Sequence, residues 1–155
     1  MVQKSPLKKL TLTEGNRARG LGEERVKWVY PIKSFIEKEI RVPMSSDCPA
    51  TSGEELINPF LGIYLAVNRK TDLEKEIGSK QKIGVYEALK SYTINSTYAC
   101  FEEDIKGSIE LGKLADMIIL DKNPLTICPE EIKDIKVLKT IISGEILYSL
   151  ENSNY

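Results

Sequence analysis

Three stretches of the chain carry apolar residues at the three- and four-residue spacing of an amphipathic helix. A short helix is predicted over 31–39, where Pro31 suits the first helical turn. A second helix is predicted to begin at Asn58 and Pro59, because Asn is a favoured N-cap and Pro a favoured first residue. A third and stronger helix is predicted over 85–100, with an apolar stripe made of Val85, Ala88, Leu89 and Tyr92.

Short apolar stretches outside these helices have the character of strands. The segment 40–46 is predicted to be a short strand that ends immediately before Asp47, although Pro43 weakens it. A second strand is predicted over 108–111. The charged residues 70–83 are predicted to form a linker or surface loop.

The last third of the chain is predicted to be mainly β-structure. A strand is expected over 115–121, where the uninterrupted apolar run Met117–Leu120 is typical of a strand buried on both faces. The stretch 137–147 is predicted to form strands, with a tight hairpin turn at Ser143 and Gly144. We expect this β part to be better ordered than the helical part.

Charge and composition exclude several partners. Lys plus Arg is 22 and Asp plus Glu is 23, so the chain lacks the basic excess of nucleic-acid binders. The longest apolar stretch, 60–67, is far shorter than the ~20 residues of a spanning helix, and no membrane association is expected. The three cysteines form no C-x-x-C pair, so we expect free, mostly buried thiols and a cytoplasmic location.

Histidine is absent from all 155 residues. This excludes a His general base, a His-activated nucleophile and every imidazole metal ligand. The length also excludes a complete eight-fold β/α barrel, which needs about 200 residues or more.

Asp47 is the first candidate for chemistry. A carboxylate just beyond a short apolar strand occupies the place where barrel enzymes keep catalytic groups, yet Asp in that position is also an ordinary turn residue. Position alone leaves both interpretations open.

Two other motifs favour structural interpretations. The segment 107–114 matches G-x-x-x-x-G-K of a phosphate-binding loop, but Leu114 stands where Ser or Thr would hold Mg²⁺, so a glycine-rich β-connection is predicted. The consecutive acids 102–104 do not share one face of any element, and a solvated helix end is predicted there rather than a metal site.

Several segments, taken in order, resemble one known family. Two of them are Glu87–Thr93 and the turn Gly112-Lys-Leu-Ala-Asp116. The others are Leu21–Arg25, Tyr30-Pro31, Ser46–Pro49, Asn58-Pro59, Ala66–Arg69, Gly107-Ser108, Asp121 and Lys139–Gly144. In this order and spacing, the segments are similar to the C-terminal third of family-3 amidohydrolases, within the metal-dependent amidohydrolase superfamily.

The resemblance implies a fold class of α/β plus β. The chain would hold the C-terminal end of a β/α (TIM-type) barrel, followed by part of a small β-sandwich, and both would be incomplete. Residues 21–100 would supply the last barrel strand and the closing helices, and 101–150 the C-terminal strands of the sandwich. Residues 1–20 match poorly, and 151–155 form a tail.

The resemblance also implies an activity. Members of the family hydrolyse non-peptide C–N bonds in small-molecule amide or formamide-like substrates, using a divalent metal, commonly zinc, to activate water. The Asp at the end of the last barrel strand contacts the metal and accepts the proton of that water, and Asp47 matches this position. Asp47 is thus the one catalytic and metal-ligating residue that the resemblance implies.

The departures from the family are large. The histidines that hold most of the metal are absent, and Ser45 stands where Gly usually precedes the Ser-Asp pair. One carboxylate does not hold a catalytic zinc, because three protein ligands are usual. We therefore expect this chain alone to bind no cofactor and to be inactive.

Three hypotheses follow from the sequence. The chain is a C-terminal portion of an amidohydrolase, a complementing subunit whose N-terminal half is encoded separately, or a non-catalytic binding module with its own α+β fold.

Overall fold

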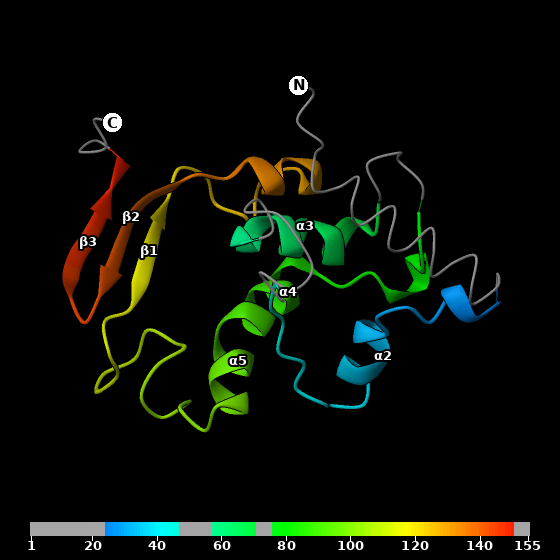
Figure 1. The fold of residues 1–155 in the computed structure, drawn as a ribbon, viewed down its shortest axis with the longest axis horizontal. Helices are drawn as coiled ribbons and strands as arrows, with labels where there is room; N and C mark the ends of the chain where they lie inside the picture. The colour runs from blue at the N-terminus through cyan, green and yellow to red at the C-terminus, as the bar shows by residue number, and fades with distance from the viewer. Residues whose placement is uncertain (1–23, 47–56, 71–75, 151–155) are drawn as a thin grey trace.

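The computed structural model describes residues 24–46, 57–70 and 76–150, and Figure 1 shows two regions within them. One region consists of helices: α2 (Ile32–Ile36), α3 (Pro59–Asn68), η2 (Ser79–Gln81), α4 (Val85–Tyr92) and α5 (Ile94–Ala99). The other is a sheet of β1 (Met117–Leu120), β2 (Val137–Ile142) and β3 (Glu145–Ser149), with η3 (Pro129–Asp134) between β1 and β2.

The α3 helix is confirmed where the sequence predicts it. The Asn58 side chain accepts a hydrogen bond from the Phe60 amide at 3.0 Å, and Pro59 occupies the first helical position. Arg69 ends the helix in the left-handed conformation, and its amide donates to the Leu65 carbonyl at 2.9 Å.

The α2 helix is shorter than the predicted 31–39. Glu39 has a left-handed φ of 58°, and the Ile40 amide reaches back to the Phe35 carbonyl at 3.0 Å. This bond closes the helix as a Schellman-type end and turns the chain into the segment 40–46.

The predicted helix over 85–100 is divided in two at Thr93. The Thr93 hydroxyl donates to the Leu89 carbonyl at 2.9 Å, and that carbonyl is the one its own amide would use in a continuous α-helix. The amide bonds to Lys90 instead, and the backbone at Thr93 leaves the helical region with φ −120° and ψ −102°. The predicted apolar stripe is confirmed, since Ala88 is fully buried and its three companions pack on the core.

The three strands form one antiparallel sheet in the order β1-β2-β3. The hairpin predicted at Ser143 and Gly144 is confirmed, with both residues at positive φ and Ile142 paired with Glu145. The strand predicted over 108–111 is wrong, because these residues form part of a loop and turn before β1.

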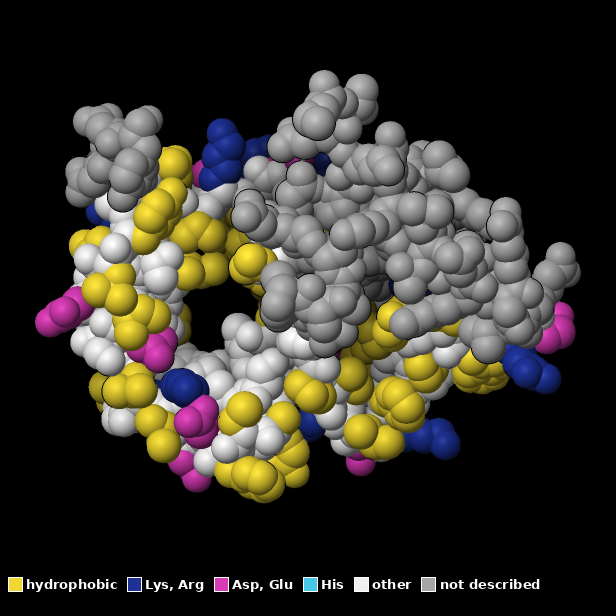
Figure 2. All heavy atoms as spheres, in the orientation of Figure 1, with side chains coloured by type: hydrophobic (Ala, Val, Ile, Leu, Met, Phe, Trp, Pro, Cys, Tyr) yellow, Lys and Arg dark blue, Asp and Glu magenta, His cyan; other side chains and the backbone are white. Residues whose placement is uncertain are grey.

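The hydrophobic core lies between α3, α4 and η3, not in the sheet. Its fully buried side chains include Phe60 and Ile63 of α3, Ala88 of α4 and Ile132 of η3. Among the described residues, the sheet reaches this core only at one end, where the paired residues Leu120 and Val137 pack against it. Figure 2 shows an opening between the sheet and the helices, with hydrophobic side chains along part of its rim.

The prediction that Met117–Leu120 is buried on both faces is wrong. Ile118 and Ile119 point to opposite faces of the sheet, yet they are 46% and 44% exposed. Nothing among the described residues covers either face fully. The apolar side chains of β1 are therefore only partly covered by the described part of the chain.

Candidate functional site

Asp47, the one predicted catalytic and metal-ligating residue, lies outside the described residues. The segment that leads to it, 40–46, is described, and it is not a strand, so that prediction is wrong for the chain as described. Its backbone hydrogen bonds go to the helices, since the Met44 amide donates to the Ser91 carbonyl at 3.0 Å. A barrel strand needs a neighbouring strand on each side, and the described part of the chain provides none beside 40–46.

Two residues at the end of α3 have structural roles that the sequence did not reveal. The buried Arg69 guanidinium donates to the Val29 carbonyl at 2.6 Å and to the Ile77 carbonyl at 3.0 Å. The buried Asn68 amide donates to the Tyr64 carbonyl at 3.1 Å and to the Pro129 carbonyl at 3.0 Å. These side chains connect α3 to segments far away in sequence, which local patterns do not show.

The hydroxyl end of Tyr92 lies against α3 at Gly62. A Cβ atom added at Gly62 would come within 1.9 Å of the Tyr92 hydroxyl oxygen, so no larger residue fits without displacing the ring. Burial raises the pKa of Tyr92 above its ordinary value. The phenol is therefore neutral at physiological pH and serves as packing between α3 and α4.

The segment 107–114 is not a phosphate-binding loop, as predicted, but it leads from α5 to β1 and does not connect two strands as the predicted β-connection would. Gly107 and Gly112 have φ of 95° and 90°, which suits glycine. The Lys113 ammonium donates to the Ser108 hydroxyl at 2.7 Å. The segment is preceded by α5 and followed by β1, whereas a phosphate-binding loop needs a strand before it and a helix directly after it.

The acids 102–104 follow the end of α5, as predicted. Glu102 forms an ion pair with Lys106 at 2.8 Å, and this pairing raises the pKa of Lys106. One ion pair within a helix-end turn is a surface interaction and offers no metal site.

Asp116 and Asp121 lie in segments that resemble the family, and each accepts a hydrogen bond from a backbone amide at an end of a strand. The Asp116 carboxylate accepts from the Ser143 amide at 2.8 Å, so it holds the β2–β3 turn. The Asp121 carboxylate accepts from the Lys136 amide at 2.9 Å, where β1 ends and β2 is about to begin. Both carboxylates bind backbone amides of the sheet, which is a structural use.

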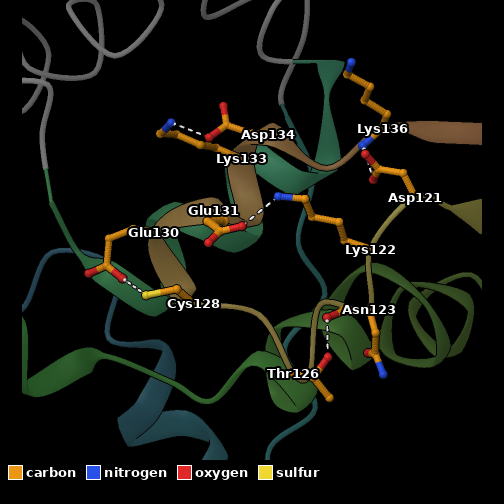
Figure 3. Close-up of polar contacts among 10 residues, drawn as sticks. All are labelled: Asp121, Lys122, Asn123, Thr126, Cys128, Glu130, Glu131, Lys133, Asp134 and Lys136. Carbon is orange, nitrogen blue, oxygen red and sulfur yellow. Dashed lines mark hydrogen bonds and ion pairs between the residues drawn. The ribbon is translucent and has the colours of Figure 1, made fainter.

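Figure 3 shows the polar contacts around η3. Lys122 pairs with Glu131 at 2.7 Å, which joins the end of β1 to η3. The Cys128 thiol donates to the Glu130 carboxylate at 2.9 Å, and this bond raises the pKa of Cys128 and lowers that of Glu130. Such a thiol is less reactive than an ordinary one at neutral pH.

The expectation of mostly buried thiols is wrong for the two described cysteines. Cys100 and Cys128 are both free and exposed. Cys100 lies directly after α5, and Cys128 lies directly before η3. Cys48 lies outside the described residues.

The donor atoms present do not fit a catalytic metal. Within 24–46, 57–70 and 76–150, no three His, Cys, Asp or Glu side chains come together as a possible metal site. The chain has no histidine anywhere, and Asp47 alone would be one ligand where three are usual. In the same ranges, no helix has both the length and the apolar character needed to cross a membrane.

The helices and sheet just described carry the sequence signature of a known class of enzyme. The sequence model of the Amidohydrolase family matches residues 9–148. The chain therefore belongs to the amidohydrolase family, as its resemblance predicted.

Individual relatives agree with this membership. The chain is 30% identical over 138 residues to the N-substituted formamide deformylase of Arthrobacter pascens, covering 89% of this chain and 24% of that protein. It is 34% identical over 131 residues to the putative amidohydrolase YtcJ of Bacillus subtilis strain 168, covering 83% and 24%. A 5-methylthioadenosine/S-adenosylhomocysteine deaminase of Caldanaerobacter subterraneus is 31% identical over 124 residues, covering 80% and 25%.

The chain thus spans about a quarter of the length of these relatives. No solved structure matches it.

Proposed function

We propose that this chain is the C-terminal portion of a metal-dependent amidohydrolase that cleaves non-peptide C–N bonds, and that it is inactive alone. The supporting observation is that the chain matches the family but lacks the residues that hold the family's metal. The family match extends over 9–148, but no histidine is present to hold the metal that the family uses. The relatives' names favour a small amide or formamide-like substrate, since one is a formamide deformylase.

In this proposal, 21–100 belongs to the end of a β/α barrel and 101–150 to part of a β-sandwich. The exposed apolar positions on both faces of β1 support an incomplete sandwich. The segment 40–46 would become the last barrel strand once neighbouring strands were present. Asp47 would be its catalytic carboxylate, and zinc would belong to the assembled enzyme, whose other ligands lie outside these 155 residues.

A complementing subunit is the second candidate. The loop between α5 and β1 exposes large apolar side chains, of which Phe101 is 92% exposed with a left-handed φ of 60°. A separately encoded N-terminal half would cover such a surface. The N-terminal half would cover these side chains in the same way whether it is a separate chain in the cytoplasm or part of one longer polypeptide.

The upstream DNA is the test of both candidates. We expect a reading frame that encodes a His-any-His pair, either continuous with this chain or separate from it. Co-expression of that frame with this chain should yield a complex that hydrolyses amides, and Asp47→Ala should abolish turnover.

A neighbouring gene unrelated to amidohydrolases would contradict the proposal. A chain that stays a monomer at micromolar concentration in the presence of that co-expressed half would contradict the complementing subunit.

A further inference from the structure

The loop that connects α5 to β1, at the lower left of Figure 1, carries three large apolar side chains that face solvent. Phe101 is 92% exposed, Ile109 is 83% exposed and Leu111 is fully exposed. Apolar residues scattered singly over a surface are ordinary, whereas several gathered in one short segment mark an interaction site. The segment 101–111 is therefore a candidate contact surface.

Phe101 occupies a position in which glycine is the usual residue. Its amide donates to the Tyr98 carbonyl at 3.1 Å, directly after the end of α5. The next amide, that of Glu102, reaches back to the Thr97 carbonyl at 2.9 Å. These two bonds form a Schellman motif, and its left-handed residue is Phe101, with φ 60°. A residue with a Cβ atom is strained in this conformation, whereas glycine is not.

The strain at Phe101 brings no matching gain within the described part of the chain. A ring that is 92% exposed makes few contacts there, so burial does not offset the cost of the left-handed backbone. Backbone strain of this kind is concentrated at functional sites. The ring is explained if it contacts a surface outside the described residues.

The loop is held in shape before it meets any partner. The Leu114 amide donates to the Ile105 carbonyl at 2.8 Å and so closes the loop. Gly107 lies against Thr97, since a Cβ atom added at Gly107 would come within 2.3 Å of the Thr97 hydroxyl oxygen. Because these contacts already order the backbone, docking of the loop costs little conformational entropy.

Four charged side chains of the loop pair with one another. The Lys106 ammonium lies 2.8 Å from the Glu102 carboxylate, and the Lys113 ammonium lies 3.7 Å from the Glu110 carboxylate. These pairs leave the apolar side chains as the part of the loop that a partner would cover, so the matching surface is apolar. The chain spans about a quarter of the length of its relatives, and the rest of such an enzyme provides a large surface for this contact.

We propose that Phe101, together with Ile109 and Leu111, docks the α5–β1 loop onto an apolar surface of the N-terminal part of the amidohydrolase. This inference rests on the proposed function, which supplies the partner. Phe101 is the main contact, because aromatic side chains contribute much of the binding energy of protein interfaces. None of the three is a catalytic residue.

Two substitutions of Phe101 in the purified 155-residue chain separate the strain from the contact. Phe101→Gly and Phe101→Ala both remove the ring, but only glycine relieves the left-handed backbone. In urea denaturation, Phe101→Gly should lower the equilibrium constant for unfolding about fivefold. Phe101→Ala should leave this constant nearly unchanged, because the ring is exposed. A clear loss of stability in Phe101→Ala, or no gain in Phe101→Gly, would overturn the proposal.

Binding to the polypeptide encoded by the upstream DNA tests the contact itself. When a tagged form of that polypeptide is co-expressed with the chain, Phe101→Gly and Phe101→Ala should be captured about tenfold less than the wild-type chain. Phe101→Leu keeps a large apolar side chain and should retain most of the binding. Tyr86→Ala is the matched control and should be captured like the wild-type chain, because Tyr86 is an exposed aromatic residue whose ring lies 5.5 Å from the Lys90 ammonium of its own helix.

The outcomes distinguish this inference from the proposed function. Equal capture of the wild-type chain and both ring-less variants, or an equal loss in Tyr86→Ala, would overturn the docking role and leave the proposed function standing. Absence of the upstream frame, or no capture of the wild-type chain, would contradict the proposed function and this inference with it. If the chain alone sediments as a dimer that Phe101→Ala converts to a monomer, the loop docks on a second copy and the proposal is wrong.

Discussion

Acidic residues in this chain separate into two kinds according to what their carboxylates touch. Asp116 and Asp121 accept backbone amide hydrogens within the sheet, whereas Glu102 and Glu131 pair with lysines at the surface. Asp47 lies outside the described residues, and its proposed role rests on its place in the family pattern. Sequence alone could not make this separation, because the amides that Asp116 and Asp121 bind lie 27 and 15 residues further along the chain.

Asp116 provides a prediction at the scale of one residue. Asp116→Ala removes the acceptor for the Ser143 amide and should lower the free energy of unfolding by about 1 kcal/mol in urea denaturation. Asp116→Asn keeps an acceptor oxygen and should lose about half as much. Asp104→Ala, at an exposed carboxylate, is the control and should change little; an equal loss in Asp104→Ala and Asp116→Ala would contradict the assigned role.

At the scale of helices and strands, the sequence predicts those features that depend only on residues adjacent in the chain. The α3 cap needs only Asn58 and Pro59, and the β2–β3 hairpin needs only Ser143 and Gly144, so both were predictable. The segment 40–46 was not, because a strand depends on partners that its own residues do not specify. The division at Thr93 was also missed, since Thr is tolerated in helices and only its side-chain bond to Leu89 ends α4.

The position of the core argues against the expectation that the β part is the better ordered half. The buried side chains belong to α3, α4 and η3, and the sheet joins them only through Leu120 and Val137. Ile132→Ala, at a fully buried residue, should therefore lower the free energy of unfolding by about 2–5 kcal/mol.

Ile119→Ala is the matched control within the sheet. Because Ile119 is nearly half exposed, this variant should lower the same free energy by about 1 kcal/mol or less in urea denaturation. If Ile119→Ala costs as much as Ile132→Ala, the sheet is part of the core and this account of the elements is wrong.

At the scale of the whole molecule, the chain combines membership of the amidohydrolase family with a sequence that contains no histidine. It spans about a quarter of its relatives' length, and its helices and sheet expose apolar surface toward an opening between them. The absence of histidine excludes a His general base, a His-activated nucleophile and imidazole metal ligands within this chain. Beside the family match, it supports the proposal that the metal ligands belong to another part of the enzyme.

Metal content and turnover of the purified 155-residue chain test this central claim most directly. The chain should contain far less than one zinc per molecule after equilibration with zinc and dialysis, and it should hydrolyse formamide and simple amide substrates no faster than buffer. Asp47→Ala should then change neither quantity. Stoichiometric zinc, together with amide hydrolysis that Asp47→Ala abolishes, would contradict the account.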